Sequence, residues 1–237
     1  MVFIMPSKNS LKDYIKGGYY HLYNRGVEKR SIFQDQQDYS VFLSYLKTYL
    51  MPKDEQGLRQ RLSDSKISAK ERDTILKLLG LNNFYEEILL ISYCLMPNHF
   101  HFLIKQKSAN GIDGFMNSLC TRYTMYFNRK YKRIGPLYQD VYKAVLVQSD
   151  EQLLYLTKYI HRNPVGHQSA LQGDTLRAVL IKQPSSYPEY LGQRKTEWIR
   201  PEEILEFFSK TNPSLPYQAF AEQKEDFGLI EKVAIDL

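Results

Sequence analysis

The stretch that decides the fold is "SYCLMPNHFHFLIKQ", residues Ser92–Gln106. It completes a segment over residues 86–96 that is dense in aliphatic and β-branched side chains, which is typical of a buried strand. Pro97 and Asn98 then predict a turn. The alternating residues 99–106 predict a second strand. The stretch therefore predicts a β-hairpin.

Two of the five histidines in the chain, His99 and His101, lie one residue apart in the second strand. Side chains at positions i and i+2 of a strand point to the same face. The two imidazoles should therefore project together, while Phe100 and Phe102 project to the opposite face. Two adjacent imidazoles form half of a divalent metal site that needs a further ligand. The alternative is a pair of solvent-facing histidines, and the motif alone leaves both interpretations open.

The segments around the hairpin alternate between strand-like and helix-like patterns. Strands are expected at 19–26 ("YYHLYNRG") and 142–148, and helices at 38–50, 111–131 and 149–163. Ser149 is the candidate N-cap of the last helix, and Pro164 ends it. This order predicts an α+β fold, in which helices pack on one face of an antiparallel sheet.

Two further regions stand apart from this pattern. Residues from about 53 to 83 are charge-rich with scattered leucines, and we expect a helical insertion at the surface. Residues 171–237 are less regular, with a helix near "PEEILEFF", and we interpret them as a C-terminal extension with an irregular tail. The predicted domain division is thus a main domain over 1–170, including the insertion, followed by the extension.

Bulk properties narrow the class of protein. The chain has 237 residues, a formal net charge of +6 and 19 tyrosines. The charge is compatible with a polyanionic partner but does not establish one. Cys94 and Cys120 have no CxxC spacing, so neither a disulfide framework nor a zinc knuckle is expected. We find neither a signal peptide nor a membrane span and expect a cytoplasmic protein that does not bind membranes.

The predicted helix at 149–163 carries a second group of polar residues. Tyr159 and Asn163 share a face with Leu156 and Ile160 at spacings of three and four residues. A phenol and an amide would therefore lie one helical turn apart. The alternative is a core tyrosine and a capping asparagine. His161 lies off this face and is expected to be exposed.

A third feature is the segment "RYTMYFNRKYKRIG", residues 122–135, which contains no acidic residue. Cations interleaved with aromatic rings suit single-stranded nucleic acid, because cations neutralise phosphates and rings stack on bases. Tyr123 and Phe127 are expected in the core, since a helix needs a buried face. The candidate DNA-binding cations in the segment are Arg122, Arg129, Lys130, Lys132 and Arg133.

Together, these segments resemble the single-tyrosine HUH transposases, particularly the REP-associated tyrosine transposases within the IS200-like family. The motifs that carry the resemblance are "GGYYHLYNRGVEKRSIF" (17–33), "MPNHFHFLI" (96–104), "RYTMYFNRKYKRIGPLYQDVYKA" (122–144), "YIHRNPV" (159–165) and "SSYPEYLG" (185–192). The resemblance implies a ferredoxin-like or RRM-like fold. It also marks the residues after Lys53 as an insertion relative to shorter members.

The resemblance assigns roles to the polar residues described above. His99 and His101 would be the metal ligands, Asn163 the further ligand and Tyr159 the nucleophile, with Mg²⁺ or Mn²⁺ as cofactor. The implied activity is cutting and rejoining of single-stranded DNA with hairpin or palindromic elements, through a 5′-phosphotyrosine intermediate. One nucleophilic tyrosine per chain implies a monomer that uses its site sequentially, or a homodimer.

Further cations would hold the DNA or favour the phenolate. Candidates for binding the DNA strand are Arg25, Arg30, Lys143 and Lys158, and the two lysines are also candidates for favouring the phenolate. Candidate stacking surfaces are Tyr23, Tyr126 and Tyr131. Two alternatives remain open: a domesticated module that binds DNA without cutting it, and a metal-dependent phosphoester hydrolase that uses water in place of tyrosine.

Overall fold

Four antiparallel strands form the centre of the molecule. The computed structural model describes residues 14–108, 110–165, 171–211 and 216–223. The strands are β1 (Tyr19–Arg25), β2 (Ile88–Met96), β3 (His99–Gln106) and β4 (Lys143–Leu146). Their order in the sheet is β2-β3-β1-β4, and each neighbouring pair is antiparallel. The predicted hairpin is therefore confirmed as β2 and β3.

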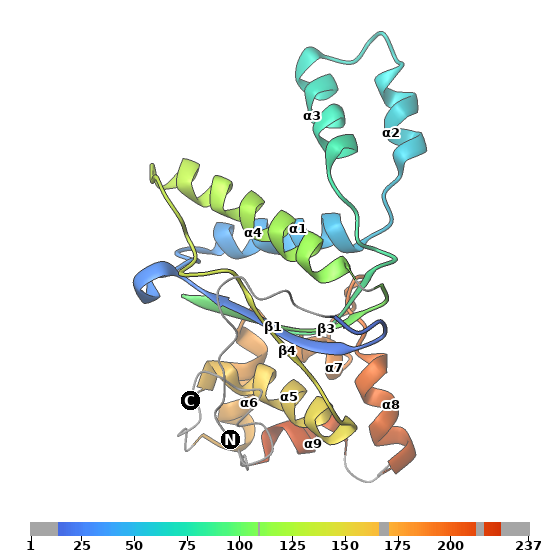
Figure 1. Cartoon of the computed structure of the whole chain (residues 1–237). Helices are drawn as coiled ribbons and strands as arrows, with labels where there is room; N and C mark the ends of the chain where they lie inside the picture. The colour runs from blue at the N-terminus through green and yellow to red at the C-terminus, as the bar shows by residue number, and fades with distance from the viewer. Residues whose placement is uncertain (1–13, 109, 166–170, 212–215, 224–237) are drawn as a thin grey trace.

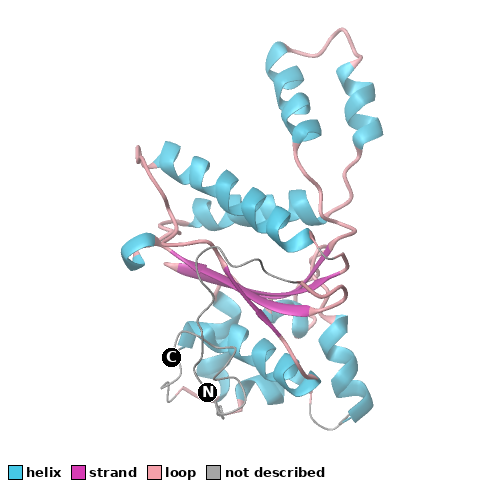
Figure 2. Cartoon of the chain, viewed as in Figure 1, coloured by secondary structure: helices cyan, strands magenta, loops and turns pink. Residues whose placement is uncertain are grey.

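Two helices connect these strands on one side of the sheet. Helix α1 (Gln36–Leu50) follows β1 and helix α4 (Gly111–Lys130) follows β3, which gives the order β-α-β-β-α-β. This order, with β1 and β3 as the central strands, is that of a ferredoxin-like fold. The α+β prediction is confirmed (Figures 1 and 2).

The core beneath α1 and α4 is aromatic. Phe100 and Phe102 of β3 are fully buried there, and their rings lie 5.5 and 6.1 Å from that of Phe42 on α1. Tyr123 and Phe127 of α4 are buried in the same cluster, as the sequence predicts. The alternation of β3 thus supplies one continuous apolar face.

Helices also cover the opposite face of the sheet, which differs from the prediction of helices on one face. They are α5 (Asp150–Arg162), α6 (Gly173–Lys182), α7 (Tyr187–Tyr190), α8 (Glu202–Thr211) and α9 (Tyr217–Glu222). The physical reason is that this face is apolar too, because Ile91, Cys94 and Leu103 project from it. Residues beyond 170 therefore contribute helices to a second core, where an irregular tail was expected.

Helix α5 is buried on more than one side. Ser149 caps it by accepting a hydrogen bond from the Gln152 amide, as predicted. His161, which was expected to be exposed, is fully buried: it bonds to Tyr217 Oη at 2.6 Å and to Ser186 Oγ at 2.8 Å. Burial lowers the pKa of His161 to about 3. The exposure prediction was wrong because α7 and α9 cover the outer side of α5.

The predicted insertion is a pair of helices that projects from the body of the molecule (Figure 1). Helices α2 (Glu55–Leu62) and α3 (Ala69–Gly80) are capped by Asp54 and Ser68. Lys53 anchors the root of the pair by donating to the carbonyl oxygens of Leu79 and Leu81. In the described part of the chain, no helix is long and apolar enough to cross a membrane.

Candidate active site

The two histidines of β3 lie on the face of the sheet that α5 covers. His99 is partly exposed and His101 is buried, and their ring centroids are 4.9 Å apart. Phe100 and Phe102 lie in the opposite core. The predicted alternation is therefore correct, and it places both imidazoles at one end of β3.

Helix α5 brings Tyr159 and Asn163 to these histidines. The buried Tyr159 ring lies edge-on to His101, with centroids 5.6 Å apart. Asn163 follows the last residue of the helix, and its Oδ1 lies 3.2 Å from His99 Nε2. The structure thus brings all four predicted residues together, although they come from two elements that are distant in sequence.

A third histidine belongs to the same site and was missed in the sequence. His21 of β1 is fully buried, and its Nε2 lies 2.9 Å from His101 Nδ1. Its ring also lies 6.1 Å from that of Tyr159, edge-on. The available signal was the alternation of "YYHLYNRG", which puts His21 and Tyr23 on one face. The segment does not reveal its register with β3, which pairs Tyr23 with His101 and so brings His21 to the site.

The donor set determines whether a metal ion could be held here. Among the described residues, no group of three or more His, Cys, Asp and Glu side chains is arranged to hold one, so a centre would need the amide of Asn163. His99 Nδ1 lies 2.6 Å from Asn98 Oδ1. Because an amide oxygen only accepts, this bond places the proton on Nδ1 and the lone pair of the neutral ring on Nε2. Nε2 then meets another acceptor, Asn163 Oδ1, and a cation fits between two such lone pairs.

The bond to His21 gives His101 a similar constraint. It engages Nδ1 of His101, so a metal bond from this ring would come from Nε2. Histidine ligands are commonly oriented in this way by a partner on their other nitrogen. Two imidazole nitrogens and one amide oxygen therefore form a set that fits a divalent ion.

The predicted cations are distributed unevenly around this centre. Arg25 of β1 pairs with His99, and Lys143 of β4 pairs with Tyr23, so both lie on strand positions beside the site. Lys158 is buried elsewhere: its Nζ lies 5.1 Å from the ring centroid of Phe220 on α9. Of the two lysines expected to favour the phenolate, Lys143 is the better placed.

The cations of α4 lie on the other side of the sheet from the histidines. Lys130 Nζ lies 2.7 Å from carboxylate oxygens of Asp35 and Asp38, and the Tyr131 hydroxyl donates to Asp38. Although burial opposes it, bonding to these carboxylates raises the pKa of Lys130. Lys130 and Tyr131 therefore fasten α4 to α1.

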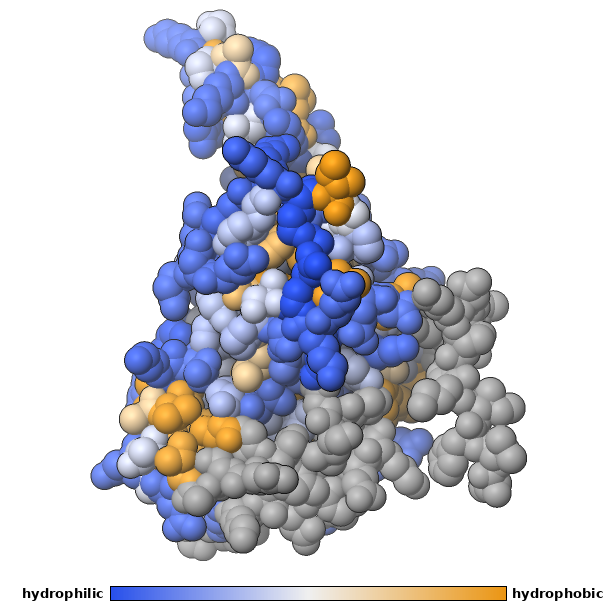
Figure 3. Space-filling view, turned by 90° about the vertical axis from the view of Figure 1, so that its left-hand side faces the viewer, coloured by the Kyte–Doolittle hydropathy of each residue, from blue (hydrophilic) through white to orange (hydrophobic). Residues whose placement is uncertain are grey.

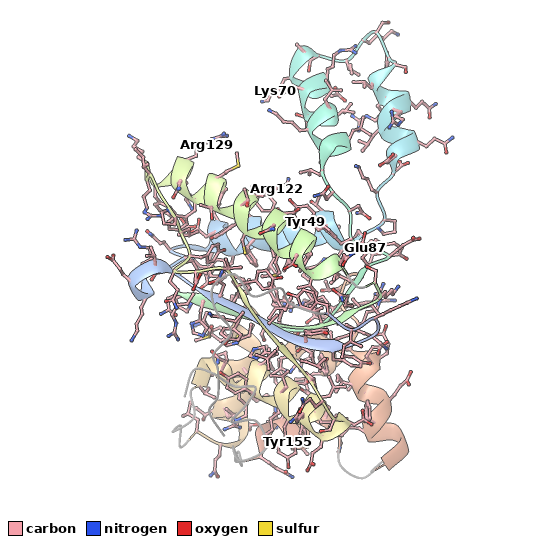
Figure 4. All side chains as sticks on the ribbon, viewed as in Figure 1. Tyr49, Lys70, Glu87, Arg122, Arg129 and Tyr155 are labelled. Atoms are coloured by element: carbon pink, nitrogen blue, oxygen red, sulfur yellow. The ribbon has the colours of Figure 1, made fainter. Side chains whose placement is uncertain are left out.

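The other predicted basic residues of this segment are more open. Arg122 lies over the ring of Tyr45 at 3.9 Å, whereas Arg129 is exposed near the end of α4 (Figure 4). Lys132 is exposed in the loop after α4, and Arg133 is partly buried there. Contact of these residues with DNA stays a prediction.

Residues 64–163 match the family model of the IS200-like transposases. The match includes β2, β3, α4, β4 and α5, and with them His99, His101, Tyr159 and Asn163. This part of the chain is thus similar in sequence to the IS200-like transposases, and it includes the four residues of the site just described.

No curated protein matches the chain. Among solved structures, it is similar to that of a REP-associated tyrosine transposase bound to a REP hairpin. The two are 12% identical, with 80% of this chain and 95% of that chain covered, at a TM-score of 0.41.

Proposed function

We propose that this protein is a transposase of the IS200-like kind, which cuts and rejoins single-stranded DNA by transesterification with Tyr159 as the nucleophile. The observation that carries the proposal is the convergence of Tyr159 and Asn163 from α5 on His99 and His101 from β3. A nucleophile beside a group of metal-binding side chains is the arrangement that phosphoryl transfer needs.

The proposed step exchanges one phosphodiester for another. The phenolic oxygen of Tyr159 forms a bond to phosphorus while the bond from phosphorus to the 3′ oxygen breaks. The phenol loses its proton and the leaving oxygen gains one, so the products are a 5′-phosphotyrosine and a free 3′-hydroxyl. Because the ester bond is conserved, the reverse reaction rejoins DNA without a nucleotide cofactor.

The residues of the chain have separate tasks in this step. His99, His101 and Asn163 would hold a divalent ion, Mg²⁺ or Mn²⁺, which when bound neutralises charge on the scissile phosphate. His21 orients His101 through its Nδ1. Burial of the Tyr159 ring among these groups fixes the nucleophile, because the covering helices leave it little freedom.

The proposed substrate is DNA with a hairpin or palindromic element beside an unpaired strand. The net charge of +6 favours a polyanion. Arg25 and Lys143 lie beside the site and are proposed to contact phosphates near the cut. The groups proposed here all come from one chain, so the step is compatible with a monomer and with a homodimer.

The test is covalent capture. End-labelled single-stranded DNA with a hairpin is incubated with the protein and Mg²⁺ or Mn²⁺, and the products are separated under denaturing conditions. We expect a protein–DNA adduct that Tyr159→Phe abolishes. Tyr155→Phe is the matched control, because Tyr155 lies one turn earlier on α5 and packs against Phe220 (Figure 4).

The outcomes separate the competing functions. Cleavage without an adduct, retained in Tyr159→Phe, would identify a hydrolase that uses water. DNA binding without cleavage by the unaltered protein, with either ion, would identify a non-cleaving module. Loss of the adduct in Tyr155→Phe as well would show that the loss reflects damage to α5 and not a missing nucleophile.

A further inference from the structure

A pocket of about 670 Å³ opens at the end of the sheet where β3 begins. Its walls are the loop after β1 and the loop after α4, and its lining includes Arg30, Arg133, Phe33, Tyr39 and Phe127. A volume of this size is typical of small-molecule sites. The pocket lies on the α1 and α4 side of the sheet, next to the turn before β3, whereas the side chains assigned to catalysis lie on the other side.

Two guanidinium groups meet in this pocket. Arg133 donates to Asn128 Oδ1 at 3.0 Å and to the Pro136 carbonyl oxygen at 3.4 Å, both uncharged acceptors. Burial, together with the nearby charge of Arg30, lowers the pKa of Arg133. Arg30 forms an exposed ion pair with Glu28 at 3.3 Å, which contributes little in solvent, whereas the acceptors of Arg133 just named are uncharged. The charge of Arg133 therefore favours a ligand that carries a negative charge.

The remaining lining distinguishes a nucleotide from a simple anion. Phe33 and Tyr39 form a stacked pair with centroids 4.6 Å apart, and the partly exposed Tyr39 faces the pocket. Gln34, Asp35 and Gln36 add amide and carboxylate oxygens. A carboxylate repels a bare phosphate but accepts hydrogen bonds from the amino groups of bases. The face of the molecule that carries the two loops is largely hydrophilic (Figure 3).

The pocket is fastened to the turn that precedes His99. The amides of Ile32 and Phe33 both donate to the Pro97 carbonyl oxygen, at 2.7 and 3.0 Å. The Gly26 amide donates to the carbonyl oxygen of Asn98 at 2.8 Å. Gly26 is required here, because a Cβ at this position would lie 2.3 Å from the carbonyl oxygen of Arg30. A strand bound in the pocket would therefore lie close to His99.

The two loops are also joined to each other and are conformationally strained. The Val27 amide donates to the Leu137 carbonyl oxygen at 2.9 Å. Within the described chain, the residues other than glycine with positive φ are Glu28, Lys29 and Lys132, at 56°, 58° and 51°, and all lie in these loops. Such strain persists only where the surrounding structure imposes it. The backbone of the two loops that carry Arg30 and Arg133 is therefore held in place by its surroundings.

We propose that this pocket binds one unpaired nucleotide of the DNA strand beside the cut, with Arg30 and Arg133 on its phosphate and its base against Tyr39. The inference rests on the proposed function for its substrate class. It adds a site that selects unpaired DNA, because a base stacked within a duplex cannot enter. Base–aromatic stacking in proteins that bind single strands tolerates every base.

The experiment measures binding in the Tyr159→Phe background, so that cleavage does not interfere. Fluorescence anisotropy is recorded with labelled oligothymidylate and with the same oligonucleotide made abasic throughout. We expect the abasic strand to bind about tenfold more weakly, since stacking one base contributes about that factor. In Arg30→Gln/Arg133→Gln, both strands should bind weakly and their difference should disappear. Arg59→Gln, a charge-matched change on α2, should leave both affinities unchanged.

A second measurement locates the base. An oligonucleotide containing 5-bromodeoxyuridine is irradiated on the protein, and we expect the cross-linked peptide to contain Tyr39. If the arginine variants lower the affinity for the normal and the abasic oligonucleotide by the same factor, the pocket contacts only the DNA backbone. That result would overturn the proposal. Cross-links confined to other peptides would do the same. Thermal melting of each variant identifies unfolding, which would disqualify that variant.

The two proposals can fail separately. If the unaltered protein forms no adduct with DNA but the base-dependent binding and the Tyr39 cross-link are observed, the pocket stands and the cleavage proposal falls. If adducts form while abasic and normal strands bind alike, the cleavage proposal stands and the pocket does not bind a base.

Discussion

The two faces of β3 show how one strand serves two purposes. On one face, Phe100 and Phe102 pack under α1 and α4 in a core that is largely apolar. On the other, His99 and His101 lie under α5, where the neighbours include His21 and Tyr159. Helices cover both faces, yet only the second contains a cluster of polar side chains that packing alone does not require.

The difference shows where the sequence departs from what packing favours. Burying imidazoles costs free energy unless they are hydrogen-bonded, and an apolar side chain at position 101 would fill the same space without that cost. His101 is instead retained and bonded to another buried histidine. Such departures from local consistency are expected at functional sites. Substitutions of the histidines on β3 should therefore reduce activity, and substitutions of the phenylalanines on its other face should reduce stability.

The largest effects should come from adjacent substitutions on β3. Phe102→Ala removes a fully buried ring and should lower the free energy of unfolding by about 3–5 kcal/mol. His101→Ala should reduce adduct formation by more than ~100-fold, beyond the effect typical of a residue that only orients a ligand. Denaturant unfolding and covalent capture on both variants check the pair.

Two results would contradict this contrast between the two faces of β3. If His101→Ala unfolds as readily as Phe102→Ala while the folded fraction still cuts DNA, the histidine is a structural residue. If a folded Phe102→Ala is as inactive as His101→Ala, the two faces are not separable in function.

Local patterns were sufficient to predict the main elements and four residues of the site. Period-two alternation placed His99 and His101 on one face, and helical spacing placed Tyr159 and Asn163 together. Both patterns are short-range, and each depends only on the geometry of one element. The resemblance to a family then related the two pairs to each other.

The failures came from contacts between segments that are distant in sequence. His161 looked exposed because its cover, Ser186 and Tyr217, comes from helices beyond residue 170. His21 was missed because its partner His101 is set by the register of β1 with β3. For Lys130, DNA contact stays a prediction, and its bonds to Asp35 and Asp38 at the start of α1 were not visible in its own segment.

His21 offers a finer test of the polar face. His21→Asn removes the ring nitrogen that meets His101 Nδ1, so His101 loses its orientation. We expect the apparent dissociation constant for Mn²⁺ to rise by about 10–100-fold, with a similar loss of adduct at low Mn²⁺. Saturating Mn²⁺ should restore part of the activity. Unchanged Mn²⁺ binding, measured by electron paramagnetic resonance, would show that His21 does not act through the metal site.

The α1 and α4 side has a polar group of its own, which we expect to serve stability. Lys130 and the hydroxyls of Tyr126 and Tyr131 bond to the buried Asp38. Asp38→Asn should lower the free energy of unfolding by about 1–2 kcal/mol at neutral pH, because buried donors lose a charged acceptor. Covalent capture by the folded variant should be unaffected. Asp73→Asn, in an exposed ion pair with Lys77, is the control and should change stability little.

Asp38 should also make the free energy of unfolding depend on pH. Although burial opposes it, bonds from Lys130 and the Gln34 amide hold the pKa of Asp38 below its usual range. A depressed carboxyl pKa contributes stability that is present above the unfolded-state value of about 3.9 and is lost as the pH falls through the lower folded-state value. The unfolding free energy of Asp38→Asn should therefore fall less steeply below about pH 4 than that of the unaltered protein. Parallel curves for the two would contradict the assignment.

The smallest effects should distinguish cations on the two faces. Lys143 lies at an exposed position of β4 beside the histidines, and its change to Gln should reduce the slope of log affinity against log salt by about 0.7, the value for one phosphate of a single strand. Arg122→Gln should leave the slope unchanged, because its guanidinium lies over the ring of Tyr45 on the other face. Anisotropy titrations at several salt concentrations measure both slopes. An equal reduction for Arg122 would mean that DNA also runs along α4, beyond the proposed nucleotide pocket.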